Sequence, residues 1–244
     1  PLSSASLRYV EATELMTKAV GLLNKRSRIN PHSRRIDGFI LSCWHLLIDL
    51  HLTQRNFEEC ERLIAEFQQT IQGWIPETDP ALADFQLTCG WVEVSQFKFF
   101  EALKTFATLQ IAEEKRYPVR HIVIARSMIG QSQALLGLSM MCVFDRLQKD
   151  SEDHARKSFD IAKSAAIEIF EAEIANEMVP GDDDLVEALL MLAVSAILVP
   201  ELENKGLPAE TLQRAEELLV DSGRHFDQLM PEIHLTFALI ARIE

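Results

Sequence analysis

Apolar residues recur every three to four positions along almost the whole chain, as they do on one face of an α-helix. The first such stretch carries Leu7, Val10, Leu15, Ala19 and Leu22. The alternation of apolar and polar residues that marks a half-buried strand is not sustained anywhere in the sequence. The pattern therefore predicts an all-α protein.

Prolines and helix-capping residues divide this pattern into ten predicted helices. Pro80 follows Asp79, a pairing typical of a helix start, and Pro208 and Pro231 also introduce helices. Ser151, which precedes acidic residues, is expected to cap another helix. The predicted helices span about residues 7–29, 33–53, 57–74, 80–95, 99–114, 119–147, 151–178, 185–199, 208–229 and 232–244. The short connections between them predict antiparallel neighbours.

Composition favours one large core. The chain has 244 residues, of which 48% are hydrophobic, and this excludes a disordered chain. We predict a single helical-repeat domain over residues 1–244, with an N-terminal helix in 1–30, about four helix pairs in 33–229, and a truncated or capping helix in 232–244. The sequence lacks an initiator methionine and stops within an apolar helical pattern, so we interpret it as a fragment of a larger protein.

Several of the predicted helix pairs share a spacing of small and large residues. In the first pair, a tryptophan and a leucine on one helix precede a small residue and two large residues on the next. Later pairs keep parts of this spacing. The residues that carry it are Trp44, Leu47, Cys60, Ile64 and Phe67, then Gly90, Phe99, Ala102 and Phe106, then Ala155, Phe159 and Ala162, then Ala215 and Leu219.

This spacing resembles the tetratricopeptide repeat (TPR), a family of antiparallel helix pairs that stack into an α-solenoid or superhelix. The small residues Cys60, Ala102, Ala155 and Ala215 would let the second helix of each pair approach the first closely. They are separated by 42, 53 and 60 residues, against about 34 in the family's ideal repeat. The sequence thus resembles a divergent TPR-like protein with longer repeats.

The resemblance implies a concave groove that binds a partner peptide or helix. In the family, the ligand-facing positions are the second, fifth, ninth and twelfth residues of the first helix in each pair. These are Ser42, His45, Asp49 and Leu52, then Asp84, Leu87, Trp91 and Val94, then Gln131, Ala134, Leu138 and Met141. Trp91 is the expected anchor, because a rigid aromatic side chain supplies much contact area at low entropic cost.

Charge is distributed unevenly along the chain. The formal net charge is −13, made up of +2 in residues 1–64, −3 in 65–170 and −12 in 171–244. Such acidity argues against a general nucleic-acid binder. One basic patch stands out, consisting of Lys25, Arg26, Arg28, Arg34 and Arg35. It could bind an acidic peptide, a phosphate group or RNA, serve as a nuclear-import signal, or be ordinary solvated charge.

The sequence contains no catalytic or metal-binding motif, so we expect no enzyme activity, no cofactor and no metal. His45 and Asp49 stand four residues apart, near His51 and Cys43. We interpret them as a hydrogen-bonded pair, because a metal needs three or four convergent ligands. The acidic run at residues 182–184 is interpreted as a helix N-terminus, where carboxylates oppose the helix dipole.

The expected compartment is intracellular. The four cysteines form no CxxC motif and are expected to be buried, reduced thiols. The longest apolar run, residues 188–200, is too short to span a bilayer, and no signal peptide opens the sequence. We therefore expect a cytoplasmic protein, or a nuclear one if the basic patch is an import signal.

Two functions remain open. The first is a non-enzymatic protein–protein interaction scaffold within a larger assembly, which binds a partner peptide or helix along the groove. The alternative is a regulatory or sensor arm of a larger transcriptional or signalling protein, which binds a small effector or an inhibitory protein. In this respect the chain resembles the helical-repeat domains attached to some bacterial transcriptional activators.

Overall fold

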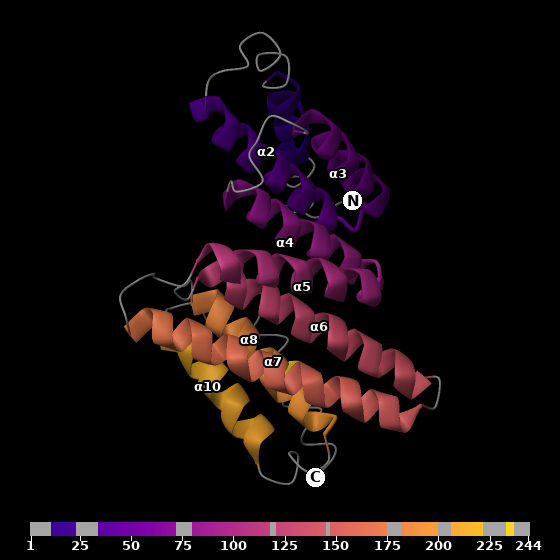
Figure 1. Ribbon diagram of the computed structural model, residues 1–244, viewed down its shortest axis with the longest axis vertical. Coiled ribbons are helices and arrows are strands. Elements are labelled where there is room, and N and C mark those ends of the chain that lie inside the picture. Colours follow the sequence, from indigo (N-terminus) through magenta and orange to yellow (C-terminus); the bar gives the residue numbers. More distant parts are fainter. Residues whose placement is uncertain are drawn as a thin grey trace. The chain divides into compact units, whose positions relative to one another are not determined.

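The structure is a computed structural model that describes residues 11–22, 34–71, 80–117, 121–144, 147–174, 182–199, 206–221 and 233–236. Within these ranges every regular element is an α-helix and none is a strand, which confirms the all-α prediction (Figure 1). The helices group into two compact units, Pro1–Gln96 (unit 1) and Phe97–Glu244 (unit 2). The single domain over residues 1–244 stays a prediction.

The observed helix bounds lie close to the predicted ones. In unit 1, α2 spans Arg34–Thr53, α3 spans Phe57–Ile71 and α4 spans Pro80–Ser95. In unit 2, α5 spans Phe99–Arg116, α6 spans Ile122–Phe144, α7 spans Gln148–Ile174, α8 spans Asp182–Ile197 and α10 spans Leu207–Asp221. Residues 11–22 and 233–236 are also helical. Among the described helices, none combines the length and apolar composition needed to cross a bilayer.

Ser151 is not a helix cap, contrary to the prediction. α7 begins before it, at Gln148, and Ser151 is only 5% exposed. Its hydroxyl lies 2.9 Å from the hydroxyl of Ser139 in α6. A serine followed by acidic residues matches a capping pattern, but here the small side chain allows two helices to pack closely.

Unit 1 is built around aromatic side chains. α2 contacts both α3 and α4, and α3 contacts α4. The ring of Trp44 meets the ring of Phe67 edge-on at 5.8 Å, and Phe67 stacks on Phe85 at 3.8 Å between ring centroids. Trp44, Phe67 and Cys60 have almost no exposed surface. Together these residues join α2, α3 and α4 into one core.

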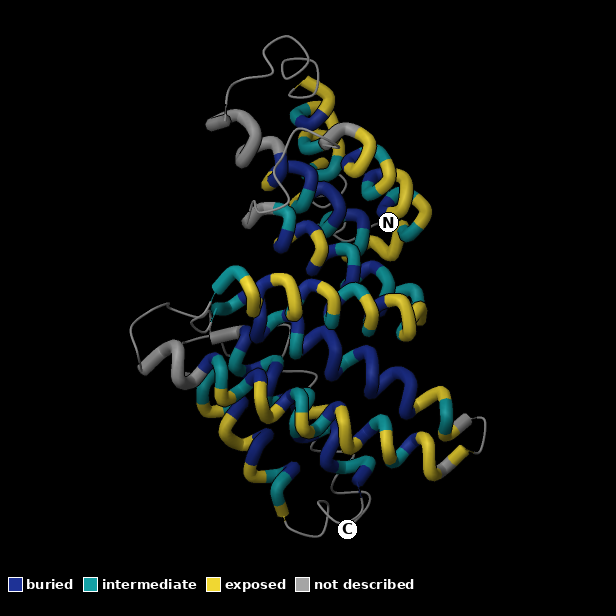
Figure 2. Tube along the Cα trace, in the orientation of Figure 1, coloured by how far each residue is buried: buried dark blue, intermediate teal, exposed yellow. Residues whose placement is uncertain are grey.

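Unit 2 packs its helices in chain order. α5 contacts α6, α6 contacts α7, α7 contacts α8, and α8 contacts α10, while α6 also contacts α8. α6 is the most enclosed of them, and Figure 2 shows it dark blue over most of its length. α7 packs through small buried residues at helical spacing: Ser151, Ala155, Ser158, Ala162 and Ala165.

Buried serines link three helices of unit 2. The Ser158 hydroxyl of α7 lies 2.9 Å from the hydroxyl of Ser132 in α6 and 2.6 Å from that of Ser195 in α8. All three side chains are fully buried. A buried hydroxyl without a partner would cost roughly 1–3 kcal/mol, so these mutual hydrogen bonds make a polar seam tolerable in the core.

Two glycines of α6 accommodate two phenylalanine rings of α5. A Cβ atom at Gly130 would lie 2.5 Å from ring carbons of Phe106, and a Cβ atom at Gly137 would collide with the ring of Phe99. The later glycine thus faces the earlier phenylalanine, which shows that α5 and α6 run antiparallel, as predicted. Only glycine leaves room for this approach.

The small residues on which the repeat prediction depends are all buried. Cys60, Ala102, Ala155 and Ala215 have no exposed surface. The large residue four positions on is also fully buried at Phe106 and Leu219, and partly buried at Ile64 and Phe159. The burial of these positions agrees with the helical spacing, whereas the pairing of helices into TPR-like repeats stays a prediction.

Candidate functional site

The residues predicted to line a groove divide between the two units. α2 and α4 of unit 1 carry those of the first two predicted helix pairs, and α6 of unit 2 carries those of the third.

In unit 1, His45 connects the predicted positions of α2 and α4. Its Nδ1 atom hydrogen-bonds with the hydroxyl of Thr88 in α4. Its Nε2 atom lies 3.3 Å from Oδ2 of Asp49, one turn along α2. The Thr88 hydroxyl also donates to the backbone oxygen of Asp84 at 3.1 Å. The interpretation of His45 and Asp49 as a polar pair is thus confirmed.

These contacts place one accessible face of α2 beside one accessible face of α4. Ser42, His45 and Asp49 share a face of α2, and Asp84 and Trp91 share a face of α4 with Thr88, because they stand three, four or seven residues apart. Ser42 and Asp84 are exposed, while the other three are partly exposed. We call these five residues the α2–α4 surface.

The remaining predicted residues of unit 1 are less accessible. Leu87 and Val94 are buried in α4. Leu52 is partly buried and packs against the unit 1 core. These three side chains therefore contribute to helix packing more than to an accessible lining.

The α2–α4 surface is acidic. Partial burial raises the pKa of the Asp49 carboxyl above its usual value, and the neighbouring His45 lowers it in part. Asp84 supplies a second, exposed carboxyl group. With the indole of Trp91 close by on the same face of α4, the surface combines carboxylates with an aromatic ring.

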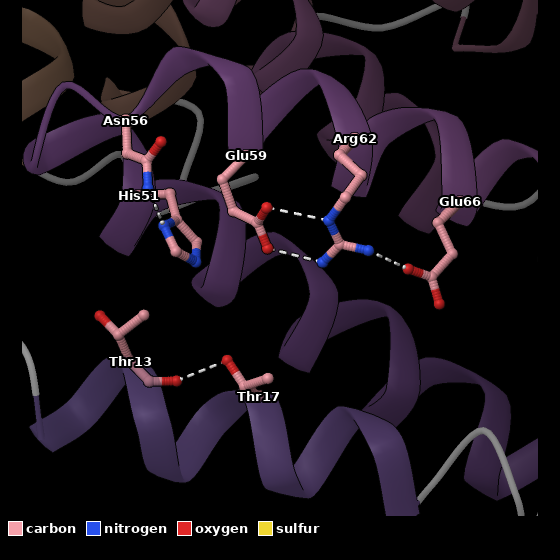
Figure 3. A network of polar contacts seen from close by, with 7 residues as sticks. All are labelled: Thr13, Thr17, His51, Asn56, Glu59, Arg62 and Glu66. Atoms are coloured by element: carbon pink, nitrogen blue, oxygen red, sulfur yellow. Dashed lines mark hydrogen bonds and ion pairs between the residues drawn. The ribbon is translucent and has the colours of Figure 1, made fainter.

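Polar groups of α3 are occupied with one another (Figure 3). The Arg62 guanidinium donates to Glu59 at 2.6 and 2.9 Å and to Glu66 at 2.8 Å. These hydrogen bonds hold the pKa of the Glu59 carboxyl below its usual value. Nearby, Nδ1 of His51 lies 3.4 Å from the side-chain nitrogen Nδ2 of Asn56. Burial lowers the pKa of His51. These contacts link successive turns of α3 and join Asn56, just before α3, to α2.

The predicted basic patch is not placed. Lys25, Arg26 and Arg28 lie outside the described residues. Arg34 and Arg35 belong to the first turn of α2, but their side chains are outside the description as well. The role of the patch therefore stays a prediction.

In unit 2, the predicted groove residues of α6 differ in accessibility. Gln131 is buried, and its amide nitrogen donates to Oε1 of Gln110 in α5 at 2.5 Å. Ala134 is fully buried and Leu138 nearly so, whereas Met141 is 47% exposed near the end of α6. Gln131 therefore binds α5 within the fold, and Met141 is the accessible member of this group.

A hollow of about 380 Å³ lies between α5, α6 and α7, and it was not predicted from the sequence. Its lining residues are Phe100 and Leu103 of α5, Leu135 and Leu138 of α6, and His154, Lys157, Asp160 and Ile161 of α7. One signal was available in the sequence. Phe99 and Phe100 are consecutive, and neighbours on a helix point about 100° apart, so both rings cannot face α6. Phe99 packs on Gly137, while Phe100 is 69% exposed at the hollow.

The polar side chains at the hollow have no protein partners among the described residues. His154 has a buried Nδ1 atom that forms no hydrogen bond with a described residue. Lys157 and Asp160 are exposed on α7, and neither forms an ion pair within the part of the chain that the structure describes. The hollow thus offers apolar walls together with charges that are not already neutralised.

The acidic run at residues 182–184 lies at a helix start, as predicted. α8 begins at Asp182. Asp184 is nearly buried and receives two hydrogen bonds from the Arg126 guanidinium of α6, at 2.9 and 3.0 Å. Asp184 therefore ties α8 to α6. Over the described residues, no group of three His, Cys, Asp or Glu side chains could hold a metal ion.

The four cysteines are all free thiols. Cys43 and Cys60 are buried, as predicted, whereas Cys89 and Cys142 are partly exposed. Burial raises the pKa of Cys60 to about 11 and the pKa of Cys89 to about 12. These thiols are therefore protonated and poor nucleophiles at neutral pH.

Comparisons with known proteins give no family assignment. No family model matches the sequence, and no curated protein matches it. A solved structure, the crystal structure of BtubC (BKLC) from P. vanneervenii, matches with a TM-score of 0.42 and 11% identity. The match covers 90% of this chain and 94% of that chain. A likeness at this TM-score carries no argument about function.

Proposed function

We propose that the protein is a non-enzymatic helical scaffold that binds a partner peptide or helix. The observation that carries this proposal is the α2–α4 surface. There the partly exposed Trp91 and the exposed Asp84 of α4 lie on a helix that is adjacent to α2, which carries Asp49. Recognition of a peptide or helix needs an apolar or aromatic anchor and a few polar groups that select the partner. The α2–α4 surface supplies both.

The chemistry of this surface favours a cationic partner. Asp49 and Asp84 attract Lys or Arg side chains, and a cation can also stack over the indole face of Trp91. The net charge of −13 would steer a basic partner toward the protein at low ionic strength. We therefore expect a basic segment with at least one apolar residue.

The packing order supports a helical-repeat arrangement. Each described helix of unit 2 contacts its next described neighbour, and α2 and α6 also contact the helix after next in the described set. Helix-pair repeats bury their apolar faces in this way, each unit against its neighbour. A TPR-like superhelix and its concave groove remain part of the proposal.

A peptide-display experiment tests the proposed function. Peptides selected by the unaltered protein are measured against Trp91→Ala, for which we expect at least about tenfold weaker binding, because aromatic anchors carry much of an interface's energy. Leu46→Ala is the matched control, since Leu46 is an exposed apolar residue of α2 outside the α2–α4 surface. Unchanged affinity of Trp91→Ala for the selected peptides would contradict the proposal.

The charge of the partner can be tested in the same assay. Asp49→Asn and Asp84→Asn should weaken binding of basic peptides and reduce its dependence on salt. Glu66→Gln is the control, because Glu66 is paired with Arg62 on α3. Selection of mainly acidic peptides would show that the surface reads a different chemistry.

The second function, a sensor arm for a small effector, is favoured by a different observation. The hollow of unit 2 has apolar walls and two charged side chains that form no ion pair with a described residue.

A further inference from the structure

The hollow of unit 2 has two chemically different sides. Its α5 and α6 walls are entirely apolar, formed by Phe100, Leu103, Leu135 and Leu138. All its polar side chains come from α7. Its volume of about 380 Å³ falls at the small end of the range of roughly 300–1,000 Å³ that is typical of small-molecule sites. A ligand here would need an apolar body with polar groups on one side only.

The α7 side presents one positive and one negative charge. Lys157 and Asp160 stand three residues apart, so both lie on the same face of the helix. They form no ion pair with each other or with any other described residue. Each charge is therefore available to a ligand. A ligand with a single charge would pair with one of these side chains and would leave the other without a partner or next to a like charge.

We propose that this hollow binds a free amino acid with a large apolar side chain. The side chain would pack against Phe100, Leu103 and the two leucines of α6, the carboxylate would pair with Lys157, and the ammonium would pair with Asp160. A fatty acid would place its anion near Asp160, and a hydrophobic amine would place its cation near Lys157. A zwitterion satisfies both charges. This inference concerns unit 2 and does not depend on the α2–α4 surface.

His154 is the third polar residue of the α7 side. Its buried Nδ1 atom has no hydrogen-bond partner among the described residues. This distinguishes His154 from His45 and His51, whose rings both contact neighbouring polar side chains.

Titration of the full chain with L-phenylalanine tests the proposal, with heteronuclear NMR chemical shifts as the readout. We expect saturable shifts confined to residues of α5, α6 and α7. 3-Phenylpropionate, which lacks the ammonium, and 2-phenylethylamine, which lacks the carboxylate, should each bind several-fold more weakly. Lys157→Ala and Asp160→Asn should weaken binding about two- to fivefold, as expected for exposed ion pairs. Leu103→Phe, which fills part of the hollow, should weaken it further.

Two control variants lie on the same helix. Lys149→Ala and Asp150→Asn remove exposed charges of α7 that lie farther along the helix and do not line the hollow, so they should leave binding unchanged. No saturable binding up to about 10 mM would overturn the proposal, because even a weak specific site saturates in that range. Equal binding of N-acetyl-phenylalanine amide would also overturn it, in favour of an apolar side chain within a peptide. So would equal binding of 3-phenylpropionate.

Discussion

Cys60 is a buried thiol whose surroundings determine its reactivity. It has no exposed surface, and its Sγ atom donates weakly to the backbone oxygen of Ile48 at 3.7 Å. Burial raises its pKa to about 11, with a smaller contribution from the negative charge of Asp49. The small residue that allows α2 and α3 to pack is thus also chemically inert.

Alkylation with iodoacetamide should reveal this inertness. At about pH 8 the thiolate fraction of Cys60 is roughly a hundredfold lower in the folded protein than in the unfolded chain, because its pKa rises from 9.0 to about 11. Mass spectrometry should find Cys60 unmodified while the partly exposed Cys142 is labelled. Denatured protein is the control, in which both cysteines should react. Rapid labelling of Cys60 in the folded protein would contradict the structure.

The lowered pKa of His51 predicts that the folded protein loses stability in mild acid. Burial lowers its pKa below 6.5, the nearby Glu59 raises it in part, and Arg62 lowers it further. The unfolded chain therefore takes up a proton that the folded protein resists. The stabilisation is present above about pH 6.5 and is lost as the pH falls through the lowered pKa, at roughly 1.4 kcal/mol for each unit of pKa difference.

Chemical denaturation at about pH 7.5 and about pH 5 measures this effect. The free energy of unfolding should fall more steeply between these values for the unaltered protein than for His51→Gln. His234→Gln is the control, because His234 is an exposed histidine paired with Glu216. The raised pKa of Asp49 acts in the opposite direction, but it is shared by all three proteins. Equal slopes for the unaltered protein and His51→Gln would contradict the assignment.

At the residue scale, it was easier to predict which side chains are buried than which side chains contact one another. The small residues Cys60 and Ala102 follow from helical spacing, because spacing determines which face of a helix is covered. Thr88 was not predicted as the partner of His45, and Lys157 was not predicted at a hollow. Such contacts depend on how far one helix is shifted along another, and no local pattern records that shift.

At the element scale, α5 and α6 are held by rings that fit over glycines. Phe99 and Phe106 stand on one face of α5, and Gly137 and Gly130 stand opposite them on α6. Glycine normally weakens a helix by about 1 kcal/mol relative to alanine. Here the close approach that it permits is expected to outweigh that cost.

Gly130→Ala should therefore destabilise the protein by about 1–3 kcal/mol, because the added methyl group would overlap the Phe106 ring. Thermal or urea unfolding measures the change. Gly21→Ala is the matched control, since nothing lies within 4 Å of its added Cβ atom, and it should stabilise by up to about 1 kcal/mol. In a protein that already carries Phe106→Leu, Gly130→Ala should cost less stability than it costs in the unaltered protein, because the smaller side chain leaves room for the added methyl group. Additive losses would contradict direct contact.

Helix positions were predictable because apolar periodicity and proline positions act locally. Pro80 begins α4, and Phe57 begins α3, as expected. Ser151 was assigned wrongly, because the same sequence pattern suits a cap and a buried serine seam. The consecutive Phe99 and Phe100 indicated only that one of these rings cannot pack against α6. The hollow itself could not be predicted, since it is a space that three helices leave unfilled rather than a property of any one of them.

At the scale of the whole molecule, each unit has a core of its own. Unit 1 packs around Trp44 and Phe67, and unit 2 contains a separate cluster around Leu212 and Ile233. The residue at the boundary is Phe97, which is 76% exposed and has a φ of 61°. A bulky residue rarely occupies this left-handed conformation, which costs roughly 1–2 kcal/mol.

Limited proteolysis should detect this boundary. Chymotrypsin is expected to cleave after Phe97 early in digestion, because the residue is exposed, aromatic and outside regular helix. The fragments 1–97 and 98–244 should each keep helical circular dichroism, since each contains its own core. Phe97→Gly should slow the cleavage and stabilise the protein by about 1 kcal/mol. Early cleavage within α6 or α7 instead would contradict this view of unit 2.

The hydroxyl contacts of Ser132, Ser158 and Ser195 also restrict how the sequence can change over evolution. Inserting one residue into the middle of α7 would rotate everything beyond it by about 100° and advance it by about 1.5 Å. Ser158 would then face away from its partners, leaving hydroxyl groups unpaired in a dry interior. A helix that packs through apolar side chains alone can absorb such a change by shifting along its neighbour. These three helices cannot, so length variation among related sequences should be confined to the connecting segments.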